Sequence, residues 1–234
     1  ENCLYATMGQ ESAPMFVLQI DPHNGDLRQF DASLSEANFC PTAHMSPDGR
    51  LYLGAAYAGH LLCFDPSQDA LVDLGAIHAQ AATFPCRIDI APDGGVWIGS
   101  YPTADLTRYD PATGEFARYG RMDDVDMYNY PLVNTDGSVA NLIRMTRSFV
   151  VVLDPESGMR RPVGPVAVQG DDTLDLFLGN DGQLYIESSL GNFVLLGFET
   201  VPVEELPPRE GPRALPDGTT FDFADAGEQS FRQL

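Results

Sequence analysis

The sequence predicts an all-β fold, a β-propeller built from four-stranded antiparallel blades. A phrase of the form Asp-Gly-x-Leu-Tyr-x-Gly occurs at residues 48–54, 93–99 and 181–186, and looser copies occur at 136–139 and 217–221. A second phrase, Asp-Pro, follows at residues 21, 65, 110 and 154, at intervals of 44, 45 and 44 residues. A period of about 40–45 residues with several short strands in each repeat is typical of propellers.

The repeat at residues 84–120 shows the expected strands in order. Residues 86–90 alternate polar and apolar side chains, as a half-exposed strand does, and residues 91–94 form a Pro-Asp-Gly turn. We expect a second strand at 95–100, a loop at 101–105, a third strand at 106–109, a turn at 110–115 and an outer strand at 116–120. Four antiparallel strands joined by turns make one blade.

The aromatic residue in each Asp-Gly phrase has a structural interpretation. Tyr52, Trp97, Tyr185 and Phe221 each lie four residues after the aspartate. We expect these large side chains to pack between neighbouring blades, where they bury the most area.

The repeats predict six units, of which the first and last are incomplete. Residues 1–5 already fit the Asp-Gly phrase, so the first repeat lacks an inner strand, and the Asp-Pro expected after Asp217 falls at the final residue. We assign residues 1–206 to propeller blades and 207–234 to a proline-rich connection and a partial last blade of the same propeller. Either the chain is a fragment of a larger propeller, or five blades close when residues near 212–215 supply the missing strand. We favour the first, with further blades or domains of a longer protein as partners.

Charge limits the class of partner. The formal net charge is −21, and all 13 basic residues are arginines. Such an acidic surface repels nucleic acid and anionic membranes, and no apolar run is long enough to span a bilayer. We therefore expect a small molecule or glycan as the partner, with no nucleic acid and no membrane. An extracellular or periplasmic location is favoured over a cytoplasmic one.

The cysteines and histidines all fall within the first 86 residues. They are Cys3, Cys40, Cys63, Cys86, His23, His44, His60 and His78. No Cys-x-x-Cys pair exists, and His60 and Cys63 would face opposite sides of a strand. We predict no metal site, leave a divalent cation open as a cofactor, and expect buried free thiols, with two disulfides as the alternative in an exported protein.

The inner strands of a propeller line its central channel, where several blades direct side chains to one point. The positions four and six residues before each turn aspartate should share one face. On that basis His44, Arg87, Asp89, Tyr130 and Asp175 converge near the axis. A shift of the alternation by one residue would turn them into the sheet packing instead.

Loops at the same end should form a funnel. Those between second and third strands carry Tyr57, His60, Tyr101, Arg144 and Arg147. The connection at 121–128 adds three aspartates and Tyr128. The aspartates could bind a cation, but their spacing is not that of a calcium loop, so we interpret them as a solvated segment.

This mixture of side chains suits a carboxylated sugar. Arginine binds a carboxylate through two parallel hydrogen bonds, and a tyrosine or histidine can remove a proton next to it. The candidate catalytic residues are His44, His60, Tyr130 and Arg87. The candidate ligand-binding residues are Tyr57, Asp89, Tyr101, Tyr128, Arg144, Arg147 and Asp175. The sequence contains no Gly-x-Ser-x-Gly motif, phosphate loop or dinucleotide fingerprint.

The two phrases resemble those of a broad propeller superfamily. Residues 47–54 with 64–66, and 92–99 with 109–114, resemble streptogramin-lyase-like, SMP-30/gluconolactonase-like and sensor-kinase propellers. The resemblance to the lyases implies a histidine and a divalent cation near the axis, with His44 or His60 in that part. The resemblance to the lactonases implies acidic and asparagine metal ligands, for which Asp89, Asp175 and Asn141 are available.

Three functions remain open at this level. The leading hypothesis is a ligand-binding propeller module that recognises a small molecule or glycan at its central funnel. The alternative is a carbon–oxygen lyase that performs β-elimination on a uronate polysaccharide or a cyclic ester. The second alternative is a protein-interaction scaffold that uses the acidic rim at Asp123, Asp124 and Asp126.

Overall fold

The computed structural model describes residues 3–10, 12–34, 37–78 and 84–209, and these form nineteen β-strands and no helix. The strands make five antiparallel sheets that follow one another along the chain. Four sheets have four strands each, and the first has three among the described residues. The predicted propeller of four-stranded antiparallel blades is therefore confirmed.

The sheets are named blades one to five in chain order. Blade one contains β1 (Leu4–Gln10), β2 (Ala13–Ile20) and β3 (Leu27–Asp31). Blade two contains β4 (Phe39–Met45), β5 (Leu51–Ala56), β6 (His60–Asp65) and β7 (Ala70–Ala76). Blade three contains β8 (Phe84–Ile90), β9 (Val96–Tyr101), β10 (Asp105–Asp110) and β11 (Glu115–Arg121).

Blade four contains β12 (Tyr128–Val133), β13 (Val139–Arg144), β14 (Ser148–Leu153) and β15 (Arg160–Val163). Blade five contains β16 (Asp175–Leu178), β17 (Leu184–Ser188), β18 (Gly191–Leu196) and β19 (Glu199–Val203). The described residues contain no helix that is long and apolar enough to cross a membrane.

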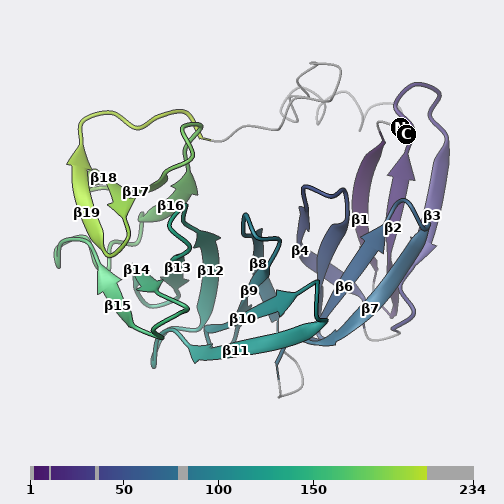
Figure 1. Cartoon of the computed structure of the whole chain (residues 1–234), viewed down its shortest axis with the longest axis horizontal. Helices are drawn as coiled ribbons and strands as arrows, with labels where there is room; N and C mark the ends of the chain where they lie inside the picture. The colour runs from purple at the N-terminus through teal and green to yellow at the C-terminus, as the bar shows by residue number, and fades with distance from the viewer. Residues whose placement is uncertain (1–2, 11, 35–36, 79–83, 210–234) are drawn as a thin grey trace.

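The blades form an arc in which the first strand of blades two to five lies on the inside and the last strand on the outside (Figure 1). The inner strands are therefore β4, β8, β12 and β16. Blade one begins with the second strand of the pattern, as the sequence predicts. The segment at 212–215 and the last Asp-Gly phrase lie outside the described residues.

The best-preserved repeat folds as predicted, apart from its first strand. β8 begins at Phe84, two residues before the predicted start, because the pairing with β9 shifts between Pro85 and Arg87 and then continues to Tyr101. The added residues bring Phe84 and Tyr101 to the same end of the blade.

The core lies between blades and not within one central cluster. Each of the four hydrophobic clusters combines buried side chains from two neighbouring blades. Tyr52 of blade two lies 6.4 Å from Tyr109 of blade three between ring centroids, and Trp97 belongs to one buried cluster with Phe149 and other residues of blade four. Tyr185 instead stacks on Phe177 of its own blade. The interblade packing predicted from the phrase is thus found for Tyr52 and Trp97, and Phe221 lies outside the described residues.

The glycine that ends the phrase is required by close approach of the next blade. A Cβ on Gly99 would lie 2.3 Å from the backbone oxygen of Asn129 and 2.4 Å from Pro131 Cδ. A Cβ on Gly54 would lie 2.6 Å from Pro85. Only glycine lets the second strand of one blade approach the inner strand of the next so closely.

The four cysteines are free thiols in the structure. Burial raises the pKa of Cys40 to about 11, that of Cys63 to about 11 and that of Cys86 to about 12. These three thiols are therefore protonated at neutral pH. Only Cys63 is fully buried, so the expectation of buried free thiols is confirmed for Cys63, whereas Cys3, Cys40 and Cys86 are half-buried.

Candidate functional site

The inner-strand side chains reach from each blade to the next. Thr42 Oγ1 accepts a hydrogen bond from the Ile88 N–H at 2.9 Å, and Asp89 Oδ2 accepts one from the Val133 N–H at 2.7 Å. His44 Nδ1 lies 3.2 Å from the Ile88 oxygen and 3.7 Å from Asp89 Oδ1. The predicted face thus places His44 beside Asp89, and part of this face is used to join inner strands.

The side chain of Asp89 is 15% exposed, against 34% for His44. Burial raises the pKa of its carboxyl, and the Val133 N–H, His44 and Arg87 partly oppose that effect. An ionised carboxylate at this position therefore depends on these donors and cationic neighbours.

Two arginines pair with the carboxylate of Asp175 at the start of β16, and a third lies within electrostatic range of it. Arg209 Nη1 donates to Asp175 Oδ2 at 2.7 Å, and Arg144 Nη2 lies 3.4 Å from Asp175 Oδ1. Arg87 of blade three interacts electrostatically with both Asp175 and Asp89. We call Arg87, Arg144 and Arg209 the arginine centre.

A chain of six aromatic rings links blades two, three and four, and we call it the aromatic series. Its members are Phe39, Tyr57, Phe84, Tyr101, Tyr128 and Tyr130. All of them lie at the ends of strands, or in loops, on the side where the chain enters the inner strands, except Tyr130, which lies two residues further along β12.

The rings in the aromatic series are in successive contact. Phe84 lies 6.0 Å from Phe39, 6.3 Å from Tyr57 and 6.5 Å from Tyr101 between centroids. Tyr101 stacks on Tyr128 at 4.5 Å, and Tyr128 lies nearly parallel to Tyr130 at 6.2 Å. Tyr57 is 63% exposed and Phe39 is 43% exposed, so one end of the series is open to solvent.

Two predicted site residues have partners away from these groups. His60 Nδ1 lies 2.9 Å from Asp73 on β7, so the histidine faces the outer strand of its own blade. Arg147 donates from Nε to Asp126 at 3.1 Å, and its guanidinium lies 4.7 Å above the Phe149 ring. Neither contact brings the side chain to the inner strands.

The acidic segment at 121–128 serves as a structural clamp. Asp126 is fully buried and accepts hydrogen bonds from the Thr146 N–H at 2.7 Å and from its hydroxyl at 2.6 Å. Asp123 Oδ2 accepts the backbone N–H groups of residues 125 and 126. Only Asp124 of the three aspartates is exposed, so the solvated interpretation of this segment is wrong for Asp126.

The possible metal ligands do not gather in the described part of the chain. Residues 3–10, 12–34, 37–78 and 84–209 contain no group of three or more His, Cys, Asp or Glu side chains arranged to hold a metal ion. Asn141, which the lactonase resemblance implied, is fully buried in β13 and donates to the Val139 and Val151 oxygens of its own blade.

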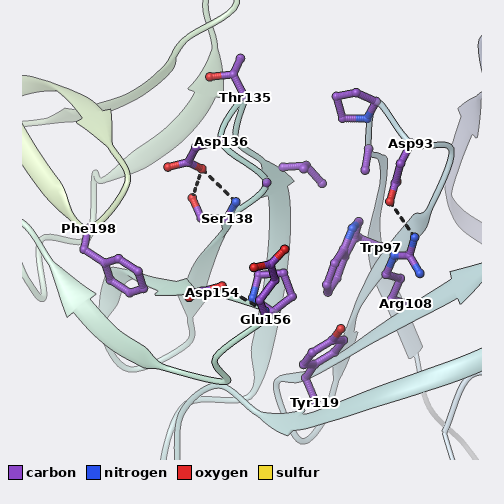
Figure 2. A pocket seen from close by; sticks show the side chains of 15 residues that line it. Asp93, Trp97, Arg108, Tyr119, Thr135, Asp136, Ser138, Asp154, Glu156 and Phe198 are labelled. Carbon is purple, nitrogen blue, oxygen red and sulfur yellow. Dashed lines mark hydrogen bonds and ion pairs between the residues drawn. The ribbon is translucent and has the colours of Figure 1, made fainter.

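A separate cavity of about 790 Å³ lies on the opposite face, at the Asp-Gly turns of blades three and four. Figure 2 shows Trp97 and Tyr119 on one side of it, Phe198 on the other, and Glu156 between them. Asp93 is paired with Arg108 at 2.8 Å, and Asp136 accepts from Ser138. No predicted site residue lines this cavity.

Sequence reasoning did not identify Phe39, Phe84 and Arg209. Phe84 lies just before the predicted first strand, and its place opposite Tyr101 follows from the register shift in β8. Arg209 lies in the proline-rich connection, and its guanidinium stacks 4.3 Å above Phe177. No repeat phrase contains either residue, so spacing could not find them.

Comparison with known proteins supports the fold and leaves the activity open. No family model and no curated protein sequence matches this chain. Virginiamycin B lyase from Staphylococcus aureus is similar in structure, with a TM-score of 0.62, 13% identity, and coverage of 90% of this chain and 71% of that chain. The chain therefore has the propeller fold of the streptogramin lyases.

Other solved structures share the fold with different assignments. The extracellular domain of a protein described as a one-component system from B. thetaiotaomicron has a TM-score of 0.58 at 15% identity, over 80% of this chain and 27% of that one. A protein from Bacteroides uniformis, described as a 6-phosphogluconolactonase, has a TM-score of 0.57 at 14% identity, over 88% and 82%. Such low identities show a common fold and no common chemistry.

Proposed function

We propose that this chain is a ligand-binding propeller module that recognises a glycan or small molecule at the loop-bearing end of its inner strands. The observation that carries the proposal is the aromatic series, six rings in successive contact across three blades. Flat aromatic rings that remain partly exposed offer apolar area at little entropic cost.

The shape of the aromatic series suits a ring-containing ligand. The C–H face of a sugar packs on an aromatic ring, and rings from neighbouring blades can hold successive units of an oligosaccharide. The turn between β5 and β6 supports this presentation, because Tyr57 lies at its tip with a positive φ of 65°. A surface built from several blades is also the concave kind of location that ligands use.

A lyase is the second candidate, and the likeness to streptogramin lyases favours it. The chemistry of the candidate base argues against it. Burial, followed by Cys86 and Tyr128, raises the pKa of Tyr130, so its hydroxyl keeps its proton at neutral pH. A general base needs a pKa near the operating pH. His44 already lies against the Ile88 oxygen and Asp89.

Two of the three carboxylates on which the scaffold alternative depends already have partners within the protein. Asp123 and Asp126 are bound by Arg147, Thr146 and backbone N–H groups. The remaining exposed carboxylate, Asp124, is too little for a specific protein interface. We also propose an extracellular or periplasmic location, which the likeness to an extracellular domain favours.

Calorimetric titration tests the binding function. The protein is titrated with a panel of neutral and uronic oligosaccharides, and ultraviolet absorbance is followed for unsaturated products. We expect saturable heats without new absorbance. Tyr101→Ala should weaken binding by at least about fivefold, since a lost ring contact costs about 1 kcal/mol. Leu27→Ala, at an exposed position of β3 in blade one, is the matched control. New absorbance would establish the lyase instead, and no heat across the panel would overturn both.

A further inference from the structure

The arginine centre is unusual in a chain with a net charge of −21. Asp175 has both carboxylate oxygens engaged, Oδ1 with Arg144 at 3.4 Å and Oδ2 with Arg209 at 2.7 Å. Arg209 also donates to Glu187 at 3.0 Å. The third arginine, Arg87, makes no ion pair with Asp175 among the described residues, although the charge of Asp175 acts on the Arg87 guanidinium and favours its protonated form.

Two guanidinium groups of this centre keep unused donors. Arg87, which is mostly buried, makes no hydrogen bond or salt bridge within the part of the chain that the structure describes. Arg144 donates from Nη2 to the Leu174 oxygen at 2.6 Å, while its buried Nε has no partner among those residues. A buried donor without an acceptor, such as the Nε of Arg144, is costly.

The neighbouring carboxylates among the described residues do not serve as acceptors for Arg87. Asp89 lies two residues from Arg87 on β8, but its Oδ2 accepts the Val133 N–H and its Oδ1 faces His44. Asp175 is shared between Arg144 and Arg209. The guanidinium N–H donors of Arg87 therefore have no acceptor among the described residues and can bind one from a ligand.

The arginine centre and the aromatic series meet on blade four. Tyr128 of β12 lies directly opposite Arg144 of β13 in the antiparallel register. Residues opposite each other in such a pair have their side chains side by side on one face of the sheet. A ligand that covers Tyr101 and Tyr128 would therefore extend towards Arg144.

We propose that Arg87 and Arg144 bind a carboxylate of the ligand, so that the module recognises acidic saccharides with uronate units. This inference rests on the proposed function and names the class of ligand. The planar carboxylate matches the guanidinium fork and supplies the acceptors that these donors lack. Tyr128 and its neighbours pack against the sugar ring, and the arginines select for the acid.

The test compares uronate oligosaccharides with their methyl esters, which keep the sugar chain and remove its charge. Calorimetry is run with oligomers of galacturonate, glucuronate and mannuronate, each as acid and as ester. We expect the acid of at least one oligomer to bind wild type at least tenfold more tightly than its ester. This preference should weaken as salt is added, because the ion pair is screened.

Arg87→Gln should abolish the preference, because it weakens binding of the acid more than binding of the ester. Arg28→Gln, which removes an exposed arginine paired with Asp69 in another part of the arc, is the matched control. Circular dichroism melting confirms that each variant is folded, and Arg144→Gln replaces Arg87→Gln if the latter does not fold.

The outcomes separate this inference from the proposed function. Equal binding of acid and ester, or a preference that survives Arg87→Gln and Arg144→Gln, overturns carboxylate recognition and keeps the binding module. Tighter binding of a sulfated neutral oligosaccharide than of any uronate also overturns it. No binding of either form overturns the module and the inference together.

Discussion

Asp89 on the inner strand of blade three accepts a hydrogen bond from the backbone N–H of Val133 on the inner strand of blade four, at 2.7 Å and 44 residues away. That separation equals one period of the repeat. Thr42, two positions earlier in its own repeat, makes a similar contact with the Ile88 N–H of blade three. Backbone N–H groups of β8 and β12 are therefore hydrogen-bonded by side chains of the preceding blade. These polar side chains have a structural role beside any role in binding.

Asp89→Asn should change how stability depends on pH. Burial raises the pKa of Asp89, so the folded state holds its proton more tightly than the unfolded chain, where the pKa is about 3.9. Wild type therefore loses stability as pH rises from about 4 through the raised value, whereas asparagine does not titrate. The free energy of unfolding in urea, variant minus wild type, should become more positive from about pH 3 to pH 7.

Asp65→Asn is the control with the opposite sign. Hydrogen bonds from Ser67 lower the pKa of Asp65, so its contribution to stability is present above the unfolded value and disappears as pH falls. The difference between this variant and wild type should become more negative with rising pH. A difference for Asp89→Asn that does not change with pH would show that its carboxyl is not perturbed.

Gly99→Ala should destabilise the protein by about 2–3 kcal/mol or more, because the new Cβ meets backbone of the adjacent blade at 2.3 Å. Gly95→Ala is the matched control, since its Cβ meets only the flexible end of Arg108. We expect that change to cost less than about 1 kcal/mol. Urea denaturation followed by circular dichroism measures both, and equal losses would contradict close packing of blade three against blade four.

Asp126→Ala should cost about 2–3 kcal/mol of unfolding free energy. Burial on its own would raise the pKa of Asp126, but hydrogen bonds from Thr146 and Arg147 outweigh it, so the pKa is lowered and the group is ionised. Its removal leaves these donors without their acceptor. Asp124→Ala, at an exposed neighbouring position, should change stability by less than about 0.5 kcal/mol. Equal midpoints for the two variants in thermal melts would show that Asp126 is not a clamp.

The sequence predicts the blades well because their determinants are local. Turn residues and alternating strands recur with each period, and the strands of blade three appear within two residues of their expected places. The inner-face alternation also places His44 beside Asp89 as expected.

The rest depends on contacts that spacing does not encode. The sequence predicts His60 in a loop of the funnel. In the structure the side chain of His60 contacts Asp73 on β7, the outer strand of the same blade. Asp126 is indistinguishable from Asp124 in composition, and only packing against Thr146 separates them. The aromatic series includes phenylalanines that belong to no repeat phrase, so its continuity emerges only when the blades are brought together.

Fluorine NMR of protein containing fluorotyrosine shows directly whether ligand lies on the aromatic series. Each of the nine tyrosines gives one resonance, assigned by substitution with phenylalanine. On titration with uronate oligosaccharides, we predict shifts for Tyr57, Tyr101 and Tyr128. Tyr119, at the cavity on the opposite face (Figure 2), should not shift. A shift of Tyr119 with unchanged Tyr101 and Tyr128 would contradict binding at the aromatic series and place the ligand at the Asp-Gly turns.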